Sequence, residues 1–350
     1  CAGSLEQVSV TGHFSVPNGG INDRQLTPIE GTVRFNDDLN TLEFFNGSEW
    51  RQFTYNQGQS GRGVYGGGNP SPTIAAPTLT SVNIHTLGNS VYFGDSTNSN
   101  WALAGSGCDG KRGVFAGGLP DSSHYNTIEY ITMSGGGNAI NFGDLSNAAG
   151  RDSGGGCSSS TRALFTGALF RTPGNTSSNI IDYIEIQTTG NALDFGDLSP
   201  DSSCNGNGFS SPTRGFFQGG GFPSSSPTIK VVTIASKGDA TKFGEMSSER
   251  SYPGGAANST RGLISGGWIS PAGLKSIDYI TMSSEGNAIN FGDLTQGRHS
   301  PAGASTLTRA IFSGGYTGPS STTDVNTIDY VTISTAGNAI DFGDLMYATS

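Results

Sequence analysis

Charged residues are scarce in this chain. Asp, Glu, Lys and Arg make up 13% of its 350 residues, which is about half of the usual share of roughly a quarter. Coiled coils and helical bundles need long runs of Ala, Glu, Lys and Leu, and this chain, with 33% apolar residues, has none. Basic residues are fewer than acidic ones, 18 against 28, so the net charge is −10. That balance argues against nucleic-acid binding, which requires clustered Lys and Arg.

Long apolar runs are missing as well. A membrane-spanning helix needs about 18 or more consecutive apolar residues. No run approaches that length, so we expect no membrane span. Prolines number only 15 and the glycines keep no three-residue period, which excludes a collagen-like chain. Four cysteines in a chain of this length do not make a disulfide framework.

Glycine and aromatic residues are abundant instead. The 55 glycines are about twice ordinary usage. The 19 Phe and 11 Tyr, together with recurring Ile and Val, are too many apolar anchors for a disordered chain. These proportions indicate a turn-rich, all-β protein.

Three markers recur in a fixed order along the chain. The string Gly-Asn-Ala-x-x-Phe-Gly-Asp-Leu occurs in full at residues 137–145, 190–198, 286–294 and 337–345, with weaker copies at 88–95 and 238–246. Its Phe recurs at intervals of 48 to 53 residues. A second marker, an Arg leading an apolar run that ends in glycine, begins at Arg62, Arg112, Arg162, Arg214, Arg261 and Arg309. The third marker is Ile-Asp/Glu-Tyr-Ile/Val, beginning at Ile128, Ile181, Ile277 and Ile328.

Each repeat is predicted to contain four short strands. A small glycine-rich strand is followed by the Arg-led strand, a loop of variable length, the Tyr-containing strand, a Gly-Asn turn and the Phe-containing strand. Four-stranded units of about 50 residues are typical of a β-propeller with kelch-length blades. We therefore expect an all-β, kelch-like β-propeller of six four-stranded blades, at residues 51–98, 99–148, 149–199, 200–247, 248–295 and 296–350. Seven blades is the alternative, if the N-terminal residues supply one.

Several positions of the repeat resemble kelch repeats. Arg250 and Arg298 precede first strands, as an Arg does in kelch units, and double glycines such as Gly117-Gly118 end second strands. Tyrosines take the third-strand place, whereas Phe replaces the usual fourth-strand Trp. The resemblance covers residues 51–350. Within this repeat the residues Cys108, Cys157 and Cys204 are expected to be small, buried side chains.

The first 50 residues lack these markers. Three strands are predicted there, at residues 32–36, 41–45 and 49–53, with an Asn46-Gly47 turn between the last two. This short β-meander resembles the β-hairpin module of bacteriophage tail-fibre and tail-associated proteins. The Phe-Gly-Asp-Leu repeats also resemble those of structural proteins from tailed phages of marine bacteria. The resemblance implies a virion protein whose N-terminal attachment module connects a distal domain to the particle.

No motif typical of catalysis or metal binding is present. The four histidines lie in different segments without metal-ligand spacing: His13, His85, His124 and His299. The Asp of each Phe-Gly-Asp string is expected to cap a turn, because catalytic carboxylates are normally unique. The Arg that begins each second strand is expected to bond neighbouring turns. We therefore expect no enzyme activity, no cofactor and no metal.

Differences between the repeats are concentrated in the loops after the second and fourth strands, which leave a propeller on the same face. Aromatic, His and Arg side chains among Ser, Thr, Asn and Gly suit stacking on a sugar or a protein interface. The candidate binding residues on this variable face are His124, Tyr125, Phe170, Arg171, Phe222, Trp268, Tyr316 and His299. The connections after the fourth strands also carry Arg151, Arg250 and Arg298.

The leading hypothesis is a non-enzymatic structural protein of a bacteriophage virion, either a tail fibre or tail-associated. It would be extracellular, part of an oligomeric assembly, and attached to other virion proteins through its N-terminal segment. Its variable face would bind a host surface polysaccharide or receptor, or a neighbouring virion protein. One alternative is a secreted or lipid-anchored bacterial carbohydrate-binding propeller, with Cys1 as the lipidated residue. The other is a carbohydrate-active enzyme.

Overall fold

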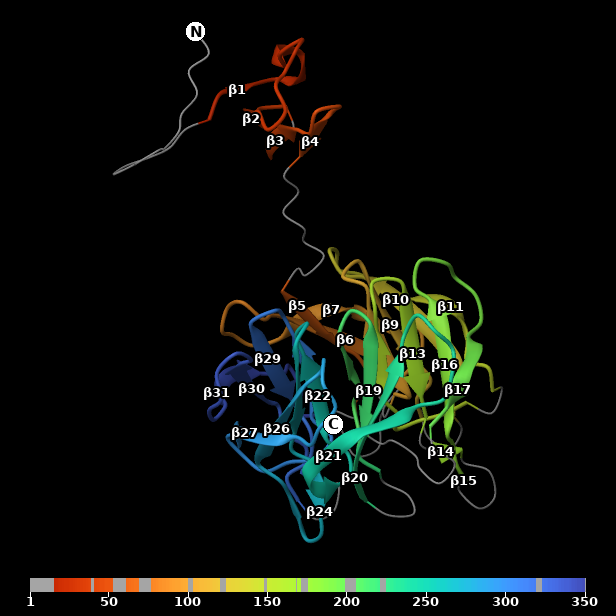
Figure 1. Cartoon of the computed structure of the whole chain (residues 1–350). Helices are drawn as coiled ribbons and strands as arrows, with labels where there is room; N and C mark the ends of the chain where they lie inside the picture. Colours follow the sequence, from red (N-terminus) through yellow and green to blue (C-terminus); the bar gives the residue numbers. More distant parts are fainter. Residues whose placement is uncertain are drawn as a thin grey trace. The chain divides into compact units, whose positions relative to one another are not determined.

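The computed structural model describes residues 16–38, 41–52, 61–68, 77–99, 103–119, 124–147, 150–167, 169–170, 176–198, 206–220, 225–318 and 323–349. The chain divides into two compact units, Cys1–Gln57 and Gly58–Ser350, where the sequence led us to expect a division after residue 50. Both units are built from β-strands, and the described residues contain a single short helix (Figure 1). The predicted all-β class is therefore confirmed.

The N-terminal unit contains a small sheet with the strand order β1-β2-β3-β4. Its elements are β1 (Asn18–Gly19), the 3-10 helix η1 (Ile21–Asp23), β2 (Val33–Asn36), β3 (Thr41–Phe45) and β4 (Trp50–Gln52). The last three strands are the predicted antiparallel meander, whereas β1 was not predicted and pairs in parallel with β2. At the predicted turn, Asn46 Oδ1 accepts the amides of Ser48 and Glu49 at 3.0 and 2.9 Å.

Polar side chains occupy the centre of this unit. Glu43 is fully buried and accepts hydrogen bonds from Arg24 Nη2 at 2.5 Å and Asn36 Nδ2 at 3.0 Å. The hydrogen bond from Arg24 lowers the pKa of Glu43, although burial opposes the shift. The Arg24 and Arg34 guanidinium groups lie 6.0 and 5.9 Å from the Trp50 ring centroid. Charge pairing and cation–π contacts therefore organise the described part of this unit.

Six sheets with the same strand arrangement make up most of the second unit. The sheets of the first three repeats are β5 (Arg62–Tyr65), β6 (Thr78–Asn83), β7 (Val91–Asp95); β8 (Gly105–Cys108), β9 (Arg112–Ala116), β10 (Thr127–Thr132), β11 (Ile140–Asp144); and β12 (Gly156–Ser158), β13 (Arg162–Thr166), β16 (Ile180–Glu185), β17 (Leu193–Asp197). Those of the last three are β18 (Phe209–Ser210), β19 (Arg214–Gln218), β20 (Ser226–Thr233), β21 (Thr241–Arg250); β22 (Gly254–Ala257), β23 (Arg261–Ser265), β26 (Ser276–Thr281), β27 (Ile289–Asp293); and β28 (Ala302–Ser305), β29 (Arg309–Ser313), β30 (Thr327–Thr332), β31 (Ile340–Asp344).

Five of these sheets have four antiparallel strands, and the first shows three within the described residues. The four strands predicted for the repeat are thus present in five repeats. Loops after second strands carry two small hairpins, β14 (Leu169–Phe170) with β15 (Thr176–Ser177) and β24 (Trp268–Ile269) with β25 (Ala272–Gly273). Both hairpins lie at the same end of the second unit (Figure 1).

Second strands are buried on both faces because each sheet packs between neighbours. In β9 every residue after Arg112 is buried, which explains the apolar run that the sequence shows there. The fourth strand is more open, and in β11 only Phe142 is buried. Phe142 meets the Tyr130 ring edge-on, with centroids 6.0 Å apart. Phe142 also shares a core with Phe165 of the next sheet, so the core lies between the sheets.

The Phe-Gly-Asp corner of each sheet contacts the Gly-Asn turn of the next. The Gly190 amide donates to the Phe142 carbonyl at 2.9 Å, and the Asp144 amide donates to Asn191 Oδ1 at 3.1 Å. A Cβ on Gly143 would lie 2.2 Å from the Gly190 carbonyl oxygen, so only glycine fits this seam. The second bond recurs from Asp95 to Asn138, Asp197 to Asp239, Glu245 to Asn287, Asp293 to Asn338 and Asp344 to Asn89. The Asp was expected to cap a turn with its side chain. The group that bonds the neighbouring turn is instead the Asp backbone amide.

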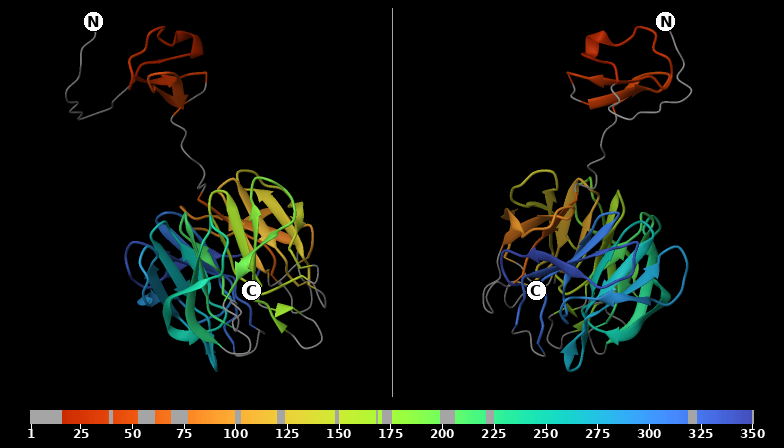
Figure 2. Two further views of the ribbon diagram at one scale, coloured as in Figure 1. Left: turned by 45° about the vertical axis from the view of Figure 1, so that its right-hand side comes forward. Right: turned by 90° about the vertical axis from the view of Figure 1, so that its left-hand side faces the viewer.

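The sixth sheet contacts the first through the same groups. The Gly88 amide donates to the Phe342 carbonyl at 3.0 Å, and the Ser90 amide donates to the Asp344 carbonyl at 2.8 Å. Ser90 Oγ also accepts the Met346 amide at 2.7 Å. In the right-hand view of Figure 2 the blue sheet lies beside the orange one.

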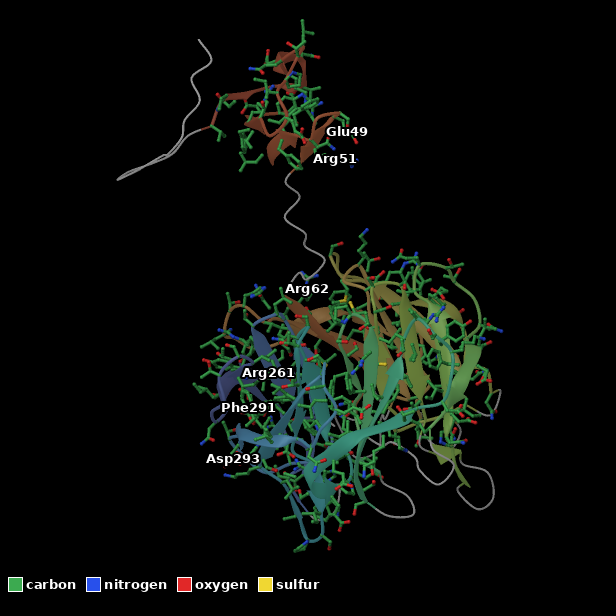
Figure 3. All side chains as sticks on the ribbon, in the orientation of Figure 1. Glu49, Arg51, Arg62, Arg261, Phe291 and Asp293 are labelled. Carbon is green, nitrogen blue, oxygen red and sulfur yellow. The ribbon has the colours of Figure 1, made fainter. Side chains whose placement is uncertain are left out.

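The Arg that begins each second strand also reaches the following sheet. Arg112 Nη1 donates to the Ile186 carbonyl at 3.0 Å, and its guanidinium lies 4.7 Å from the Tyr130 ring centroid. Corresponding bonds run from Arg62 to Met133, Arg162 to Ile234, Arg214 to Met282, Arg261 to Ile333 and Arg309 to Ile84. Figure 3 shows Arg261 on the sheet that carries Phe291 and Asp293. The structural role predicted for this Arg column is confirmed.

The first strand of each four-stranded sheet is its inner strand, and the inner strands of neighbouring sheets approach each other closely. A Cβ on Gly156 would lie 2.1 Å from the Ser106 carbonyl oxygen, and one on Gly303 would lie 2.0 Å from that of Gly255. Ser158 Oγ donates to the Cys108 carbonyl at 2.9 Å across one such contact. The abundance of glycine therefore reflects backbone-to-backbone packing as well as turns.

The cysteines behave differently from one another. Cys157 is buried, as predicted, but Cys108 is exposed, so that prediction was wrong for Cys108. Cys108 is the last residue of β8, so its side chain lies at the end of the strand, where solvent reaches it. Cys204 lies outside the described residues.

Replacing a seam glycine is expected to destabilise the second unit strongly. A Cβ on Gly244 would lie 2.0 Å from the Gly286 carbonyl oxygen, and backbone cannot move aside as a flexible side chain can. Gly244→Ala should therefore lower the free energy of unfolding by about 3 kcal/mol, the upper range for overpacking. Urea unfolding measures the change. Gly135→Ala is the matched control, because a Cβ there meets nothing within 4 Å; equal stability of the two variants would contradict the seam.

Candidate ligand-binding site

A cavity of about 420 Å³ lies between the inner strands of the second unit. All six sheets contribute to its wall, through Val64, Gly105, Gly156, Gly208, Gly255 and Gly303. Its volume falls within the range of about 300–1,000 Å³ that is usual for small-molecule sites. We refer to it as the central cavity.

The central cavity extends toward the variable loops. Its wall includes Tyr252 and Ser300, which follow fourth strands, and Tyr316, which follows a second strand. A second cavity of about 510 Å³ shares part of the wall but extends to the turns between first and second strands, such as Asn258. Each inner strand runs from the end that carries the variable loops to the end that carries these turns. The two cavities therefore open at opposite ends of the second unit.

Four aromatic rings gather beside the central cavity. His299 is at their centre, with its ring centroid 5.3 Å from that of Trp268, 5.1 Å from Tyr316 and 6.2 Å from Tyr252. Backbone pairing holds the loops together, because Ser251 pairs with Trp268 and His299 with Tyr316. Loops after second strands are thereby joined to the connections after fourth strands.

The structure brings three of the predicted binding residues together: Trp268, Tyr316 and His299. His299 and Tyr316 line the central cavity, whereas Trp268 packs behind His299. Burial lowers the pKa of His299, although a hydrogen bond from its imidazole to the Gly318 backbone carbonyl opposes the shift. At neutral pH the rings of Trp268 and Tyr316 and the uncharged imidazole of His299 therefore meet at one end of the fold.

The other predicted residues do not join this cluster. His124 Nε2 lies 3.1 Å from Asp152 Oδ2, and the two side chains are only 3% and 4% exposed. Tyr125 bonds through its backbone, its amide donating to the Gly118 carbonyl at 2.8 Å. Neither residue lines the central cavity. Phe170 belongs to β14, but its side chain lies outside the described part, as do Arg171 and Phe222 entirely.

Three arginines of the variable connections are fully buried, which the sequence reading did not foresee. Arg250 Nη2 lies 2.9 Å from Asp278 Oδ2, and Arg298 Nη2 lies 3.1 Å from Asp329 Oδ2. Arg151 pairs with Asp182 in the same way. Burial lowers the pKa of each guanidinium, and the paired Asp opposes the shift. The signal was the acidic residue of the Ile-Asp-Tyr marker, which lies in the third strand of the same repeat, 28 to 31 residues after each Arg.

The buried arginines position residues of the cavity wall. Two residues after each Arg, the backbone takes a left-handed conformation, with φ of 50° at Ser153, 54° at Tyr252 and 57° at Ser300. Non-glycine residues rarely adopt such a conformation, which costs of the order of 1–3 kcal/mol. All three residues line the central cavity. The neighbouring ion pair therefore holds a strained turn that aims its residue at the cavity.

The described wall of the central cavity contains no Asp, Glu, Lys or Arg. Among the residues the structure describes, no group of three His, Cys, Asp or Glu side chains is placed to hold a metal ion. Within the same residues, no helix has the length and apolar character needed to cross a membrane. A scan of protein-family models finds no match to the chain, and a search of curated proteins finds none.

Replacement of His299 is expected to reduce the pH dependence of stability. Because the folded pKa lies below the unfolded value of about 6.5, the unfolded chain takes up a proton first as the pH falls. The stability linked to His299 is therefore fully present above about pH 6.5 and is lost as the pH falls toward the folded pKa. Urea unfolding of the wild type and His299→Gln at pH 7.5, 6 and 5 should show a smaller loss in the variant.

The exposed His85 supplies the control for this experiment. His85→Gln should keep the pH dependence of the wild type. Parallel pH profiles for His299→Gln and the wild type would show that burial of His299 does not shift its protonation.

Proposed function

We propose that the chain is a non-enzymatic virion protein of a tailed bacteriophage, either a tail fibre or tail-associated. Its second unit is a closed, kelch-like β-propeller of six blades, and its N-terminal unit attaches it to other virion proteins. The end of the propeller where the variable loops gather binds a host surface glycan or receptor. The observation that carries the binding role is the meeting of Trp268, His299 and Tyr316 beside the central cavity.

Closure of the propeller is supported by the repetition of one seam. The bond from the Asp144 amide to Asn191 has its counterpart between Asp344 and Asn89, which are 255 residues apart. The Arg309 bond to Ile84 likewise matches the bond that Arg112 makes to Ile186. A ring joined in this way leaves neither of its terminal sheets with an unpacked face.

The attachment role rests on the separation and character of the N-terminal unit. It is a compact unit of its own, and its meander carries the residues that resemble a phage tail-fibre hairpin. Its buried described side chains are polar, namely Arg34, Asn36 and Glu43. A small polar module of this kind suits a connector between a particle and a displayed domain.

Removing residues 328–350 is expected to abolish soluble folding. The truncation deletes β31 and nearly all of β30, and with them the seam to the first sheet. The first and fifth sheets then lose the partner that covers them, and exposed edges and apolar faces favour aggregation. The soluble fraction and the thermal transition measure the outcome. Removal of residues 1–50 is the control and should leave a soluble propeller; a well-folded chain ending at residue 327 would argue against a closed ring.

Antibody labelling tests the location. An antibody raised against the second unit should label purified phage particles in electron micrographs, at the tail or its fibres. A chain absent from the particles would overturn the virion assignment. A secretion signal encoded upstream of Cys1 would favour the bacterial lectin instead.

A further inference from the structure

We propose that the central cavity binds one uncharged saccharide unit of the host-surface ligand. This inference rests on the proposed function and names the ligand class for the same end of the fold. It depends on three properties of the cavity wall: its lack of charge, its hydroxyl groups and its aromatic rings.

The wall carries no charge that could receive an ionised ligand. Its described residues include neither cations nor carboxylates, and burial keeps His299 neutral by lowering its pKa. A carboxylate or phosphate that entered the cavity would lose its hydration without gaining a counter-ion, which costs several kcal/mol. The chain as a whole is also acidic, with a net charge of −10. An uncharged ligand avoids both penalties.

Hydroxyl groups of the wall can bond a ligand. Ser106, Ser153 and Ser300 line the cavity, and none of them is buried. A serine hydroxyl both donates and accepts hydrogen bonds. A molecule rich in hydroxyl groups supplies both donors and acceptors to them.

Aromatic rings at the mouth suit the other face of a sugar. A pyranose presents C–H groups on its faces, and the electron-rich faces of aromatic rings pack against such groups. Tyr252, His299 and Tyr316 each line the cavity and are partly exposed. The aromatic rings and hydroxyl groups of one wall therefore match the two kinds of surface of one saccharide unit.

The cavity is also preformed. Glycines of the inner strands line it, and their backbones abut the neighbouring sheet, as at Gly156 and Gly303. The buried Arg250 and Arg298 hold the turns that carry Tyr252 and Ser300. A rigid site loses little conformational entropy on binding, which favours the binding of a small ligand.

The test uses the full chain and a panel of paired sugars. The neutral probes are glucose, galactose and mannose, and their charged counterparts are glucuronic, galacturonic and mannuronic acids. Saturation-transfer NMR detects binding and calorimetry measures its strength. We expect binding of at least one neutral sugar, and at least tenfold weaker binding of its uronic acid.

Two variants place the binding in the central cavity. Ser106→Ala removes an exposed hydroxyl of the wall with little change in volume, and Tyr316→Ala removes a partly exposed ring. Each should weaken the binding of the neutral sugar at least tenfold while the thermal transition stays near that of the wild type. Tyr92→Ala is the control, because Tyr92 is an exposed ring on the outer strand β7 and should have no effect.

The inference is overturned if no neutral sugar of the panel binds, if a uronic acid binds as well as its neutral partner, or if neither variant weakens binding. Competition for host adsorption separates this failure from failure of the proposed function. If the purified chain blocks adsorption of the phage but no neutral sugar does, the virion function stands and the saccharide assignment falls. If the chain neither occurs on particles nor blocks adsorption, the proposed function falls as well.

Discussion

The contact on which the second unit depends is one between backbones: a Gly-Asn turn seated against the Phe-Gly-Asp corner of the preceding sheet. A Cβ on Gly244 would lie only 2.0 Å from the Gly286 carbonyl oxygen. The close approach permits the amide of Glu245 to reach Asn287 Oδ1 at 3.1 Å. The apolar strands then pack between sheets held at this spacing, and the central cavity is the space that remains between their inner strands.

Scarcity of charge follows from the same arrangement. Second and third strands are covered on both sides, so they have little room for ionised side chains. Three buried arginines are each paired with a buried Asp, and breaking such a pair by removing one partner typically costs about 3–5 kcal/mol. Arg250 with Asp278 and Arg298 with Asp329 are examples. These pairs join the packing between repeats to the strained turns that form the cavity wall.

The sequence predicted the strands of the repeat well, because three markers recur in order and each corresponds to a local structure. It also predicted the bonding role of the Arg column. The burial of Arg298 could not be predicted from the position of that residue alone, because its partner Asp329 lies 31 residues further along the chain, in the third strand of the repeat. His124 was misleading for a similar reason, since Asp152 covers it from a different connection. The cavity itself depends on how closely the inner strands of neighbouring sheets approach one another, and no local pattern records that distance.

The hydrogen bond between Asp344 and Asn89 spans 255 residues, almost three quarters of the chain. During synthesis the Gly-Asn turn of the first sheet is therefore made well before its partner and stays without it until Asp344 leaves the ribosome. Closing so long a loop carries an entropic cost that neighbouring contacts must offset. The nascent chain must accordingly keep the face of its first sheet from associating with other molecules, and completion of the last sheet is the step that ends this exposure.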